Sequence, residues 1–534
     1  MNLGEHQAAV DATLIDLESR EIPSRILRQD CTVWKPDPRG IIDRLGWLTV
    51  PDFMGQQVDS LIAFAKDVKS KGVRHVVLLG MGGSSLGPEV LRSVFGTTLG
   101  YPELIILDST VPDRLVSITN IIDPAHTLFL ISSKSGETLE TLTGYRHFRT
   151  IIDKALGEET AGGCFVAITD SDSPLDRIAK QESFLKVFTN PSTIGGRYSV
   201  LSYFGMVPAA LTGIDVSLLL DRAARFRETI SAKIPVEENP GVWLGAVIAT
   251  LAAIGRDKLT LLTSPTLSNF GLWVEQLIAE SLGKEGKGVI PIVGEPLLAK
   301  KHYGNDRLFI DLRLGDDGSS KPESYVDELR AGGNPVIQLN LSDRYDIGRE
   351  FYRWEYATAV AGAVMAVNPF DQPNVELSKD KTVEILKTYT GTGKMVSFET
   401  SSSLCGLLNQ ALPGDYLAIL VYVEPTPEID EALSDLRERI MIHSRIATTV
   451  GYGPRFLHST GQLHKGGPPT GLYFQLTTDS YQDINVPGAG YTFGALTNAQ
   501  SQGDFQTLEL LGRRTAKMHI AGDVVTAIEK LLVK

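Results

Sequence analysis

Cysteine is scarce in this sequence, which has three cysteines in 534 residues and no pair at the C-x-x-C spacing. They are Cys31, Cys164 and Cys405. Three scattered cysteines exclude a disulfide scaffold and a recognisable zinc site, and they are typical of a protein of a reducing compartment. We therefore expect a cytoplasmic location and no metal centre.

Long apolar runs and excess positive charge are also missing. The longest apolar stretch, Ala357–Val367, is too short to span a bilayer, and the first 20 residues carry acids without the apolar core of a signal peptide. The formal net charge is −13, so the surface as a whole repels nucleic acid and anionic membranes. We expect neither as a partner, and an anionic substrate would need a local positive site.

The chain length is typical of two or three domains. Short apolar runs, each followed by a polar turn and a helical segment without hairpin signals, predict an α/β fold with parallel sheets covered on both faces. A first series of strands is expected at Val73–Leu79, Leu104–Leu107, Leu128–Ile131 and Phe165–Ile168. A second series is expected at Leu259–Leu262, Leu308–Leu312, Val336–Leu339 and Leu417–Val423. The predicted boundaries are a helical arm over 1–54, a first α/β domain over 55–234 and a second over 235–534 with a C-terminal extension.

The polar segment after the third expected strand carries an unusual number of hydroxyl groups. It contains Ser133, Lys134, Ser135 and Thr138, and a helix is expected to begin at Leu139. Backbone amides at the positive end of a helix dipole bind anions, and hydroxyls and an ammonium group add donors. The pattern favours a phosphate site. The alternative is an ordinary N-cap, for which one hydroxyl suffices.

A glycine-rich loop, Gly80–Ser85, follows the first strand, and a helix is expected from Pro88. Its glycines Gly80, Gly82 and Gly83, which precede Ser84 and Ser85, would let the backbone approach a ligand closely. A dinucleotide fingerprint is one alternative, with Asp108 near the acidic position, although Ser85 stands where the third glycine belongs. A plain tight turn is the other alternative.

Two charged residues are candidates for chemistry. Arg197 follows two glycines, and arginine suits bidentate contact with oxyanions; a structural ion pair is the alternative. Glu280 lies near the C-terminal end of an expected helix, Phe270–Leu282, where the dipole disfavours a carboxylate. A carboxyl group with a raised pKa suits a general base. The alternative is a solvated glutamate at a helix end.

Two later segments carry further polar candidates. Gln372 and Lys379 lie in a segment that follows a long apolar helix. Residues 457–467 contain His458 among glycines and hydroxyl groups. Histidine can transfer protons near neutral pH, although most histidines in such loops bond to the backbone instead.

Taken together, these segments resemble the glucose-6-phosphate isomerase family from about residue 34 to the C-terminus. The motifs are GMGGSSLGP at 80–88, SKSGET at 133–138, GGRYS at 195–199, ESLGK at 280–284 and FDQPNVELSK at 370–379. The first two occur in sugar isomerase domains generally, and the others are more specific to this family. The arrangement resembles the isomerase half of transaldolase–phosphoglucose isomerase fusion proteins, with no transaldolase part visible. The resemblance implies two sugar-isomerase (SIS-type) αβα sandwich domains.

The resemblance also implies roles for single residues. Glu280 matches the base that moves a proton between C1 and C2, Arg197 the arginine that stabilises the enediolate, and Lys379 a ring-opening lysine. Gln372 matches a neighbour in the site. The phosphate group is expected on Ser133, Ser135 and Thr138, with Gly83, Ser84 and Lys134 close by. His458 matches the ring-opening histidine, but its motif follows the lysine motif instead of preceding it, so His302 is the alternative.

The implied reaction is the reversible isomerisation of glucose 6-phosphate to fructose 6-phosphate through an enediol, in glycolysis and gluconeogenesis. It needs no cofactor. A homodimer is expected, because the family completes each site with a histidine from the partner. The alternative function is a sugar-phosphate sensor, which would need only the phosphate loop. An amidotransferase would need an N-terminal cysteine nucleophile, and the earliest cysteine is Cys31.

Overall fold

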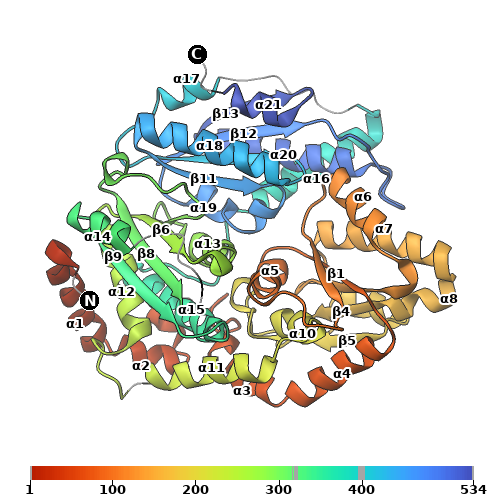
Figure 1. Ribbon diagram of the computed structural model, residues 1–534, viewed down its shortest axis with the longest axis horizontal. Helices are drawn as coiled ribbons and strands as arrows, with labels where there is room; N and C mark the ends of the chain where they lie inside the picture. The colour runs from red at the N-terminus through yellow and green to blue at the C-terminus, as the bar shows by residue number, and fades with distance from the viewer. Residues whose placement is uncertain (1–2, 232, 316, 318–322, 395–402, 532–534) are drawn as a thin grey trace.

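The strands in the described part of the chain form three sheets, and every strand pair within them is parallel. The computed structural model describes residues 3–231, 233–315, 317, 323–394 and 403–531. Helices connect the strands along the chain. The predicted α/β class with parallel sheets is therefore confirmed, and Figure 1 shows the three sheets arranged around α5 and α13.

The first sheet has five strands in the order β2-β1-β3-β4-β5. Its strands are β1 (His75–Gly80), β2 (Glu103–Leu107), β3 (Thr127–Ser132), β4 (Phe165–Thr169) and β5 (Lys186–Thr189). Alternate residues of β1 enter different cores: Val76 and Leu78 join one apolar cluster, and Val77 and Leu79 join another. Because successive side chains of a strand point to opposite faces, both faces of this sheet are buried.

The remaining strands form two four-stranded sheets, with the orders β7-β6-β8-β9 and β11-β10-β12-β13. The second sheet contains β6 (Lys258–Thr263), β7 (Ile290–Ile292), β8 (Arg307–Leu314) and β9 (Val336–Leu341). The third contains β10 (Tyr416–Tyr422), β11 (Ala447–Tyr452), β12 (Gly471–Thr478) and β13 (Arg514–Ile520). The strand expected at Leu417–Val423 thus belongs to a separate sheet, drawn in blue in Figure 1. The exact domain boundaries stay a prediction.

Three helices position the site. The helix α7 (Leu139–Leu156) begins, and α13 (Phe270–Leu282) both begins and ends, where the sequence predicts. The expected start of α5 near Pro88 is wrong, because α5 spans Gly83–Phe95 with Pro88 inside it. Proline has no N–H to donate to the carbonyl four residues earlier, which is that of Ser84. The Ser132 hydroxyl donates to this carbonyl instead, at 3.4 Å.

The N-terminal arm packs against α15 (Asp346–Met365), a helix whose residues are nearly all buried. The arm contains α1 (Gln7–Ser19), α2 (Ile22–Leu27) and α3 (Val50–Gly55). The Trp34 indole N–H donates to the Ala359 carbonyl at 2.8 Å, and its ring meets Phe370 edge-on. The arm therefore supports the core beneath the site. Within the described part of the chain, no helix has the length and hydropathy required to cross a membrane.

Candidate active site

Two polar loops of the first sheet lie side by side. Gly80 at the end of β1 is paired in register with Ser132 at the end of β3, so the loops that follow them leave the same edge of the sheet. In parallel α/β sheets this carboxyl edge is where ligands bind. The structure therefore places the glycine loop and the hydroxyl-rich loop together at a typical ligand-binding edge.

The hydroxyl-rich loop is ordered by its own side chains. The Ser133 and Thr138 hydroxyls lie 2.9 Å apart, and the Gly136 amide donates to the Ser133 hydroxyl at 3.1 Å. Thr138 occupies the N-cap position of α7 but accepts no hydrogen bond from that helix. The amides of the first turn of α7 have no partner within the helix. The ordinary-cap alternative thus does not account for the Thr138 hydroxyl, which lies beside these amides.

Lys134 points its charge away from the two hydroxyls. Its ammonium group forms an ion pair with Asp170 and donates to the Ser192 carbonyl at 2.9 Å. Ser135 is exposed, and its hydroxyl accepts from the Glu137 amide at 3.2 Å. The positive potential of this loop therefore comes mainly from backbone amides and the helix dipole.

In the glycine loop, the backbone packs closely against the backbone of two other segments, at Gly196 and at His458. A Cβ atom on Gly83 would lie 1.8 Å from the Gly196 carbonyl oxygen, so a larger residue does not fit. Gly82 has a φ of +55°, and a Cβ atom there would lie 2.8 Å from the His458 carbonyl oxygen. Ser84 is buried in the first turn of α5. The glycines thus allow the segments of Arg197 and His458 to approach the edge of the first sheet.

Arg197 and Glu280 form a buried ion pair, with Nη1 3.2 Å from Oε1. The exposed fractions of these residues are 4% and 9%. Arg197 Nη2 donates to the Asp371 carbonyl at 2.9 Å, whereas Nη1 has no hydrogen-bond acceptor among the described residues. Glu280 Oε2 accepts from Gln276 at 3.0 Å. A fixed cation therefore lies beside a fixed carboxylate.

Lys284 holds the segment that contacts Arg197. Its ammonium group donates to the Asn368 carbonyl at 2.7 Å, to the Asp371 carbonyl at 2.6 Å and to the Asp371 carboxylate at 2.7 Å. Burial and the Arg197 charge lower the pKa of Lys284 to about 8, against the opposing effect of Asp371. The ESLGK and FDQP motifs are therefore joined through one buried side chain.

His458 lies in the 3-10 segment η9 (Arg455–His458) and contacts the first turn of α7. Its Nε2 is 2.9 Å from Glu140 Oε1. Burial acts to lower the pKa of His458, but the Glu140 carboxylate outweighs it and raises that pKa above its ordinary value. Gln276 donates to the His458 carbonyl and to Glu280, each at 3.0 Å. The histidine and the carboxylate candidate therefore belong to one connected site.

Gln462, four residues after His458, joins the His458 segment to the ESLGK and FDQPNVELSK motifs. It is buried, donates to the Gly283 carbonyl at 3.0 Å and to Asn374 Oδ1 at 2.7 Å, and accepts from the Asn374 amide at 2.9 Å. These contacts join three motifs that are far apart in sequence. His302 lies elsewhere, in η8 (Lys300–His302), and no contact among the described residues joins it to Glu140 or Glu280. The geometry therefore favours His458 over His302.

Lys379 and Gln372 lie at the solvent side of the site. The Lys379 side chain is 54% exposed and pairs with Glu376 at 2.8 Å, near the start of α16 (Glu376–Thr392). Burial and the contact between Glu140 and His458 are the main influences on the pKa values of that pair, and the Lys379 charge adds a smaller effect that lowers both. Gln372 is exposed in the loop before α16.

Glu140 is the main residue that sequence reasoning missed. An acid in the first turn of a helix is a common stabilising feature, so its position gave no special signal. Asp108 had been considered as a ribose ligand in the dinucleotide alternative, but its carboxylate is buried and bound bidentately by Arg455 at 2.7 and 2.8 Å. That contact disfavours the dinucleotide alternative.

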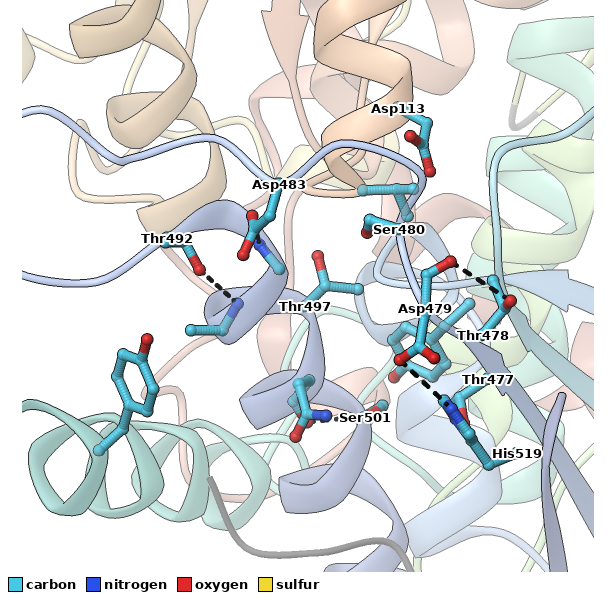
Figure 2. Close-up of a pocket in the computed structure, with 16 residues that line it drawn as sticks. Asp113, Thr477, Thr478, Asp479, Ser480, Asp483, Thr492, Thr497, Ser501 and His519 are labelled. Atoms are coloured by element: carbon cyan, nitrogen blue, oxygen red, sulfur yellow. Dashed lines mark hydrogen bonds and ion pairs between the residues drawn. The ribbon is translucent and has the colours of Figure 1, made fainter. Parts of the chain in front are cut away.

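A cavity of about 310 Å³ is lined by other residues and does not include the Arg197–Glu280 pair. Figure 2 shows it beside α20 (Phe493–Leu510), with Thr497 and Ser501 from that helix and His519 from β13 around it. Asp113 from α6 (Pro112–Ile121) and Asp479 from the loop after β12 add carboxylates. The lining of this cavity therefore contributes neither the cation nor the carboxylate of that pair.

The family model and the relatives that this chain matches point to the same family. Residues 52–290 match the model of the phosphoglucose isomerase family. A glucose-6-phosphate isomerase from Rubrobacter xylanophilus is 30% identical over 417 residues, which are 69% of this chain and 94% of that protein. One from Staphylococcus saprophyticus is 29% identical over 391 residues, 64% of this chain and 87% of that protein.

The fold is also similar to that of a solved structure. A crystal structure of a hypothetical protein from Thermus thermophilus is 26% identical and has a TM-score of 0.61. The match covers 71% of this chain and 97% of that one. The range matched by the family model includes both polar loops, Arg197 and Glu280, and it ends before Lys379 and His458. The described residues hold no cluster of three or more histidine, cysteine, aspartate or glutamate side chains suited to a metal ion.

Proposed function

This chain belongs to the phosphoglucose isomerase family, and from that premise we propose that it interconverts glucose 6-phosphate and fructose 6-phosphate. The observation that carries the proposal is the buried Arg197–Glu280 pair, which Gln276 and His458 connect to the first turn of α7. A sugar-phosphate sensor, the alternative considered from the sequence, would need only the phosphate loop. The reaction is one step of glycolysis and gluconeogenesis.

The proposed chemistry uses side chains of this chain alone. The Glu280 carboxylate takes the proton from C2 of the open-chain aldose and returns it to C1, and the hydroxyl proton on O2 moves to O1, which together yield the ketose. The intermediate is an enediolate, whose negative oxygen needs a fixed donor. Arg197 supplies one: its Nη1 is buried and, although 3.2 Å from Glu280 Oε1, makes no well-aligned hydrogen bond among the described residues. A fixed donor that needs no reorganisation during the reaction is an effective form of electrostatic stabilisation.

A coupled assay tests the activity. Fructose 6-phosphate is supplied with an enzyme that oxidises glucose 6-phosphate, and the reduced nicotinamide is followed by absorbance. We expect turnover of fructose 6-phosphate and little or none of fructose, because the phosphate contact contributes binding energy used to position the reacting carbons. Binding of the sugar phosphate without turnover would support the sensor instead.

We place the phosphate group of the substrate on Ser133, Thr138 and the amides at the start of α7. The Ser133→Ala, Thr138→Ala double variant should raise KM more than it lowers kcat, because the contact is mostly uniform binding. Each hydrogen bond to a charged group contributes about 1.5–3 kcal/mol, so KM should rise at least about tenfold. Steady-state kinetics with fructose 6-phosphate measures this.

Inhibition by free phosphate is the second measurement for this loop, and it should weaken in the double variant. Ser171→Ala is the matched control, because Ser171 is an exposed hydroxyl outside this loop and should leave both quantities unchanged. Phosphate inhibition that stays at the wild-type level in the double variant would place the phosphate elsewhere. Ser135, Lys134, Ser84 and Gly83 remain proposed neighbours of the phosphate.

We assign ring opening to His458, assisted by Lys379. Glu140 stabilises the protonated imidazole, and the other charges near His458 are Glu280 on α13 and Lys379 on α16. The Glu140→Gln variant removes the charge that raises the pKa of His458, so this pKa should fall. The limb of the pH–kcat/KM profile that reports His458 should therefore move to lower pH.

Glu137→Gln is the control for that measurement. Glu137 lies in the hydroxyl-rich loop, three residues before Glu140. It is exposed, and its carboxylate does not contact His458 in the structure. The pH profile of this variant should match that of the wild type. An unchanged profile in Glu140→Gln would mean that another group controls the observed limb.

The cytoplasmic location, the homodimer and the absence of nucleic-acid or membrane partners stay predictions. The homodimer was expected because the family takes a histidine from the partner. Here the histidine that contacts Glu140 comes from the same chain, so this reason for a dimer is weaker.

A further inference from the structure

Two buried polar side chains outside the proposed mechanism connect the first and third sheets. Thr110 lies in the loop between β2 and α6, and Gln500 lies on α20. Their exposed fractions are 0% and 3%. The Thr110 hydroxyl donates to Gln500 Oε1 at 2.7 Å, and Gln500 Nε2 donates to Glu140 Oε1 at 2.7 Å. The chain of contacts thus ends on the oxygen that also contacts His458.

The donors in this chain have a fixed order. The Thr497 hydroxyl donates to the Thr110 carbonyl at 2.8 Å and also lies 3.0 Å from the Thr110 hydroxyl, which donates to Gln500 Oε1 at the shorter distance of 2.7 Å. A flipped Gln500 amide would turn its carbonyl oxygen toward the Glu140 carboxylate, and two acceptors repel each other. The amide orientation and the ionised state of Glu140 therefore support each other.

The ionised state of Glu140, which the Gln500 amide supports, determines which nitrogen of His458 carries a proton. An ionised carboxylate only accepts hydrogen bonds, so Nε2 must be the donor toward Glu140. In the neutral imidazole the other nitrogen, Nδ1, is then the acceptor. We propose that Thr110 and Gln500 are positioning residues that fix Glu140 and thereby hold neutral His458 in its Nε2–H tautomer, with Nδ1 directed to proton exchange with the sugar.

The role of Nδ1 in ring opening rests on the proposed isomerase function, but the tautomer itself does not. The charges that face His458 are Glu140 from α7, Glu280 from α13 and Lys379 from α16. None of these is altered by a change at Thr110 or Gln500. A change at either position therefore tests the hydrogen-bond chain while every charge in the site is kept.

The experiment compares Thr110→Val and Gln500→Leu with the wild-type chain. Selective ¹⁵N labelling of histidine reports the ring nitrogens, and His458→Asn identifies the His458 signals by their loss. In the wild type at a pH where His458 is neutral, Nε2 should have the shift of a protonated nitrogen and Nδ1 that of an unprotonated one. Both variants should move these shifts toward a mixture of tautomers.

Kinetics gives the second readout. With KM nearly kept, kcat should fall by about tenfold, a fraction of the roughly 10²- to 10⁴-fold that general acid–base catalysis contributes. Thr110→Ser restores the donor and should recover wild-type shifts and kcat. Gln502→Leu is the control, because Gln502 is a second buried glutamine of α20 whose amide donates to Asn498 rather than to Glu140.

The outcomes separate the two proposals. A wild-type chain without isomerase activity would refute the proposed function, while the ¹⁵N shifts would still decide the tautomer. An active wild type whose His458 shifts and kcat are unchanged in both Thr110→Val and Gln500→Leu would overturn the positioning role. Equal losses in Thr110→Ser and Thr110→Val would also overturn it, because the hydroxyl would then not be the group that matters.

Discussion

Replacing Glu280 with glutamine is expected to lower kcat by about 10²- to 10⁴-fold, the usual contribution of a general base. Glutamine keeps the shape of the side chain and still accepts from Gln276, but it does not accept a proton. The substrate affinity should be nearly kept, because the phosphate contacts lie in another loop. Steady-state kinetics with fructose 6-phosphate measures both quantities.

Proton exchange identifies the base more directly. In deuterated water the wild-type chain should exchange the C2 proton of glucose 6-phosphate with solvent, and Glu280→Gln should lose this exchange. Exchange at the wild-type rate would show that Glu280 is not the base. Glu275 and Glu355 would then be tested next, since burial raises the pKa of Glu275 to about 8 and that of Glu355 well above its ordinary value.

Local sequence patterns predicted the elements of the site well. The helix bounds Phe270–Leu282 and the start of α7 agree with the structure, because apolar spacing and flanking turn residues determine them locally. The start of α5 was wrong because Pro88 suggested a first turn. The contact that makes Pro88 tolerable inside the helix comes from Ser132, 48 residues away from Ser84 in the chain.

Long-range contacts explain what the sequence left open. The family motif matched His458, but the order of the motifs left His302 as the alternative, because spacing does not show which segments meet. The structure favours His458 through Glu140, which is 318 residues away along the chain, and through Gln276. Gln462 and Gln500 likewise act only through residues distant in sequence, and a single glutamine carries no local pattern.

The separate third sheet was not predicted for the same reason. Its central strand, β10, was expected from an apolar run, but β12 was not, although it is buried along most of its length. A strand buried on both faces lacks alternation, and short apolar runs do not state which partner they pair with. The sheet to which each strand belongs is a tertiary property.

The second large effect is expected at Arg197. Arg197→Met removes the donor to the enediolate and should lower kcat by about 10²- to 10³-fold, as loss of one oxyanion donor typically does. It also leaves the buried Glu280 carboxylate without its cation, which should reduce the free energy of unfolding by about 3–5 kcal/mol. Kinetics and denaturant unfolding measure the two effects.

A double variant separates catalysis from stability. In Arg197→Met with Glu280→Gln, no charge is left buried without a partner, so much of the lost free energy of unfolding should return while kcat stays low. Arg197→Lys keeps a charge but loses the planar guanidinium that reaches both Glu280 and the Asp371 carbonyl. The kcat of this variant should therefore lie between those of the wild type and Arg197→Met. If Arg197→Met lost stability but kept wild-type kcat, the arginine would serve only to hold Glu280, and the enediolate would need a different donor.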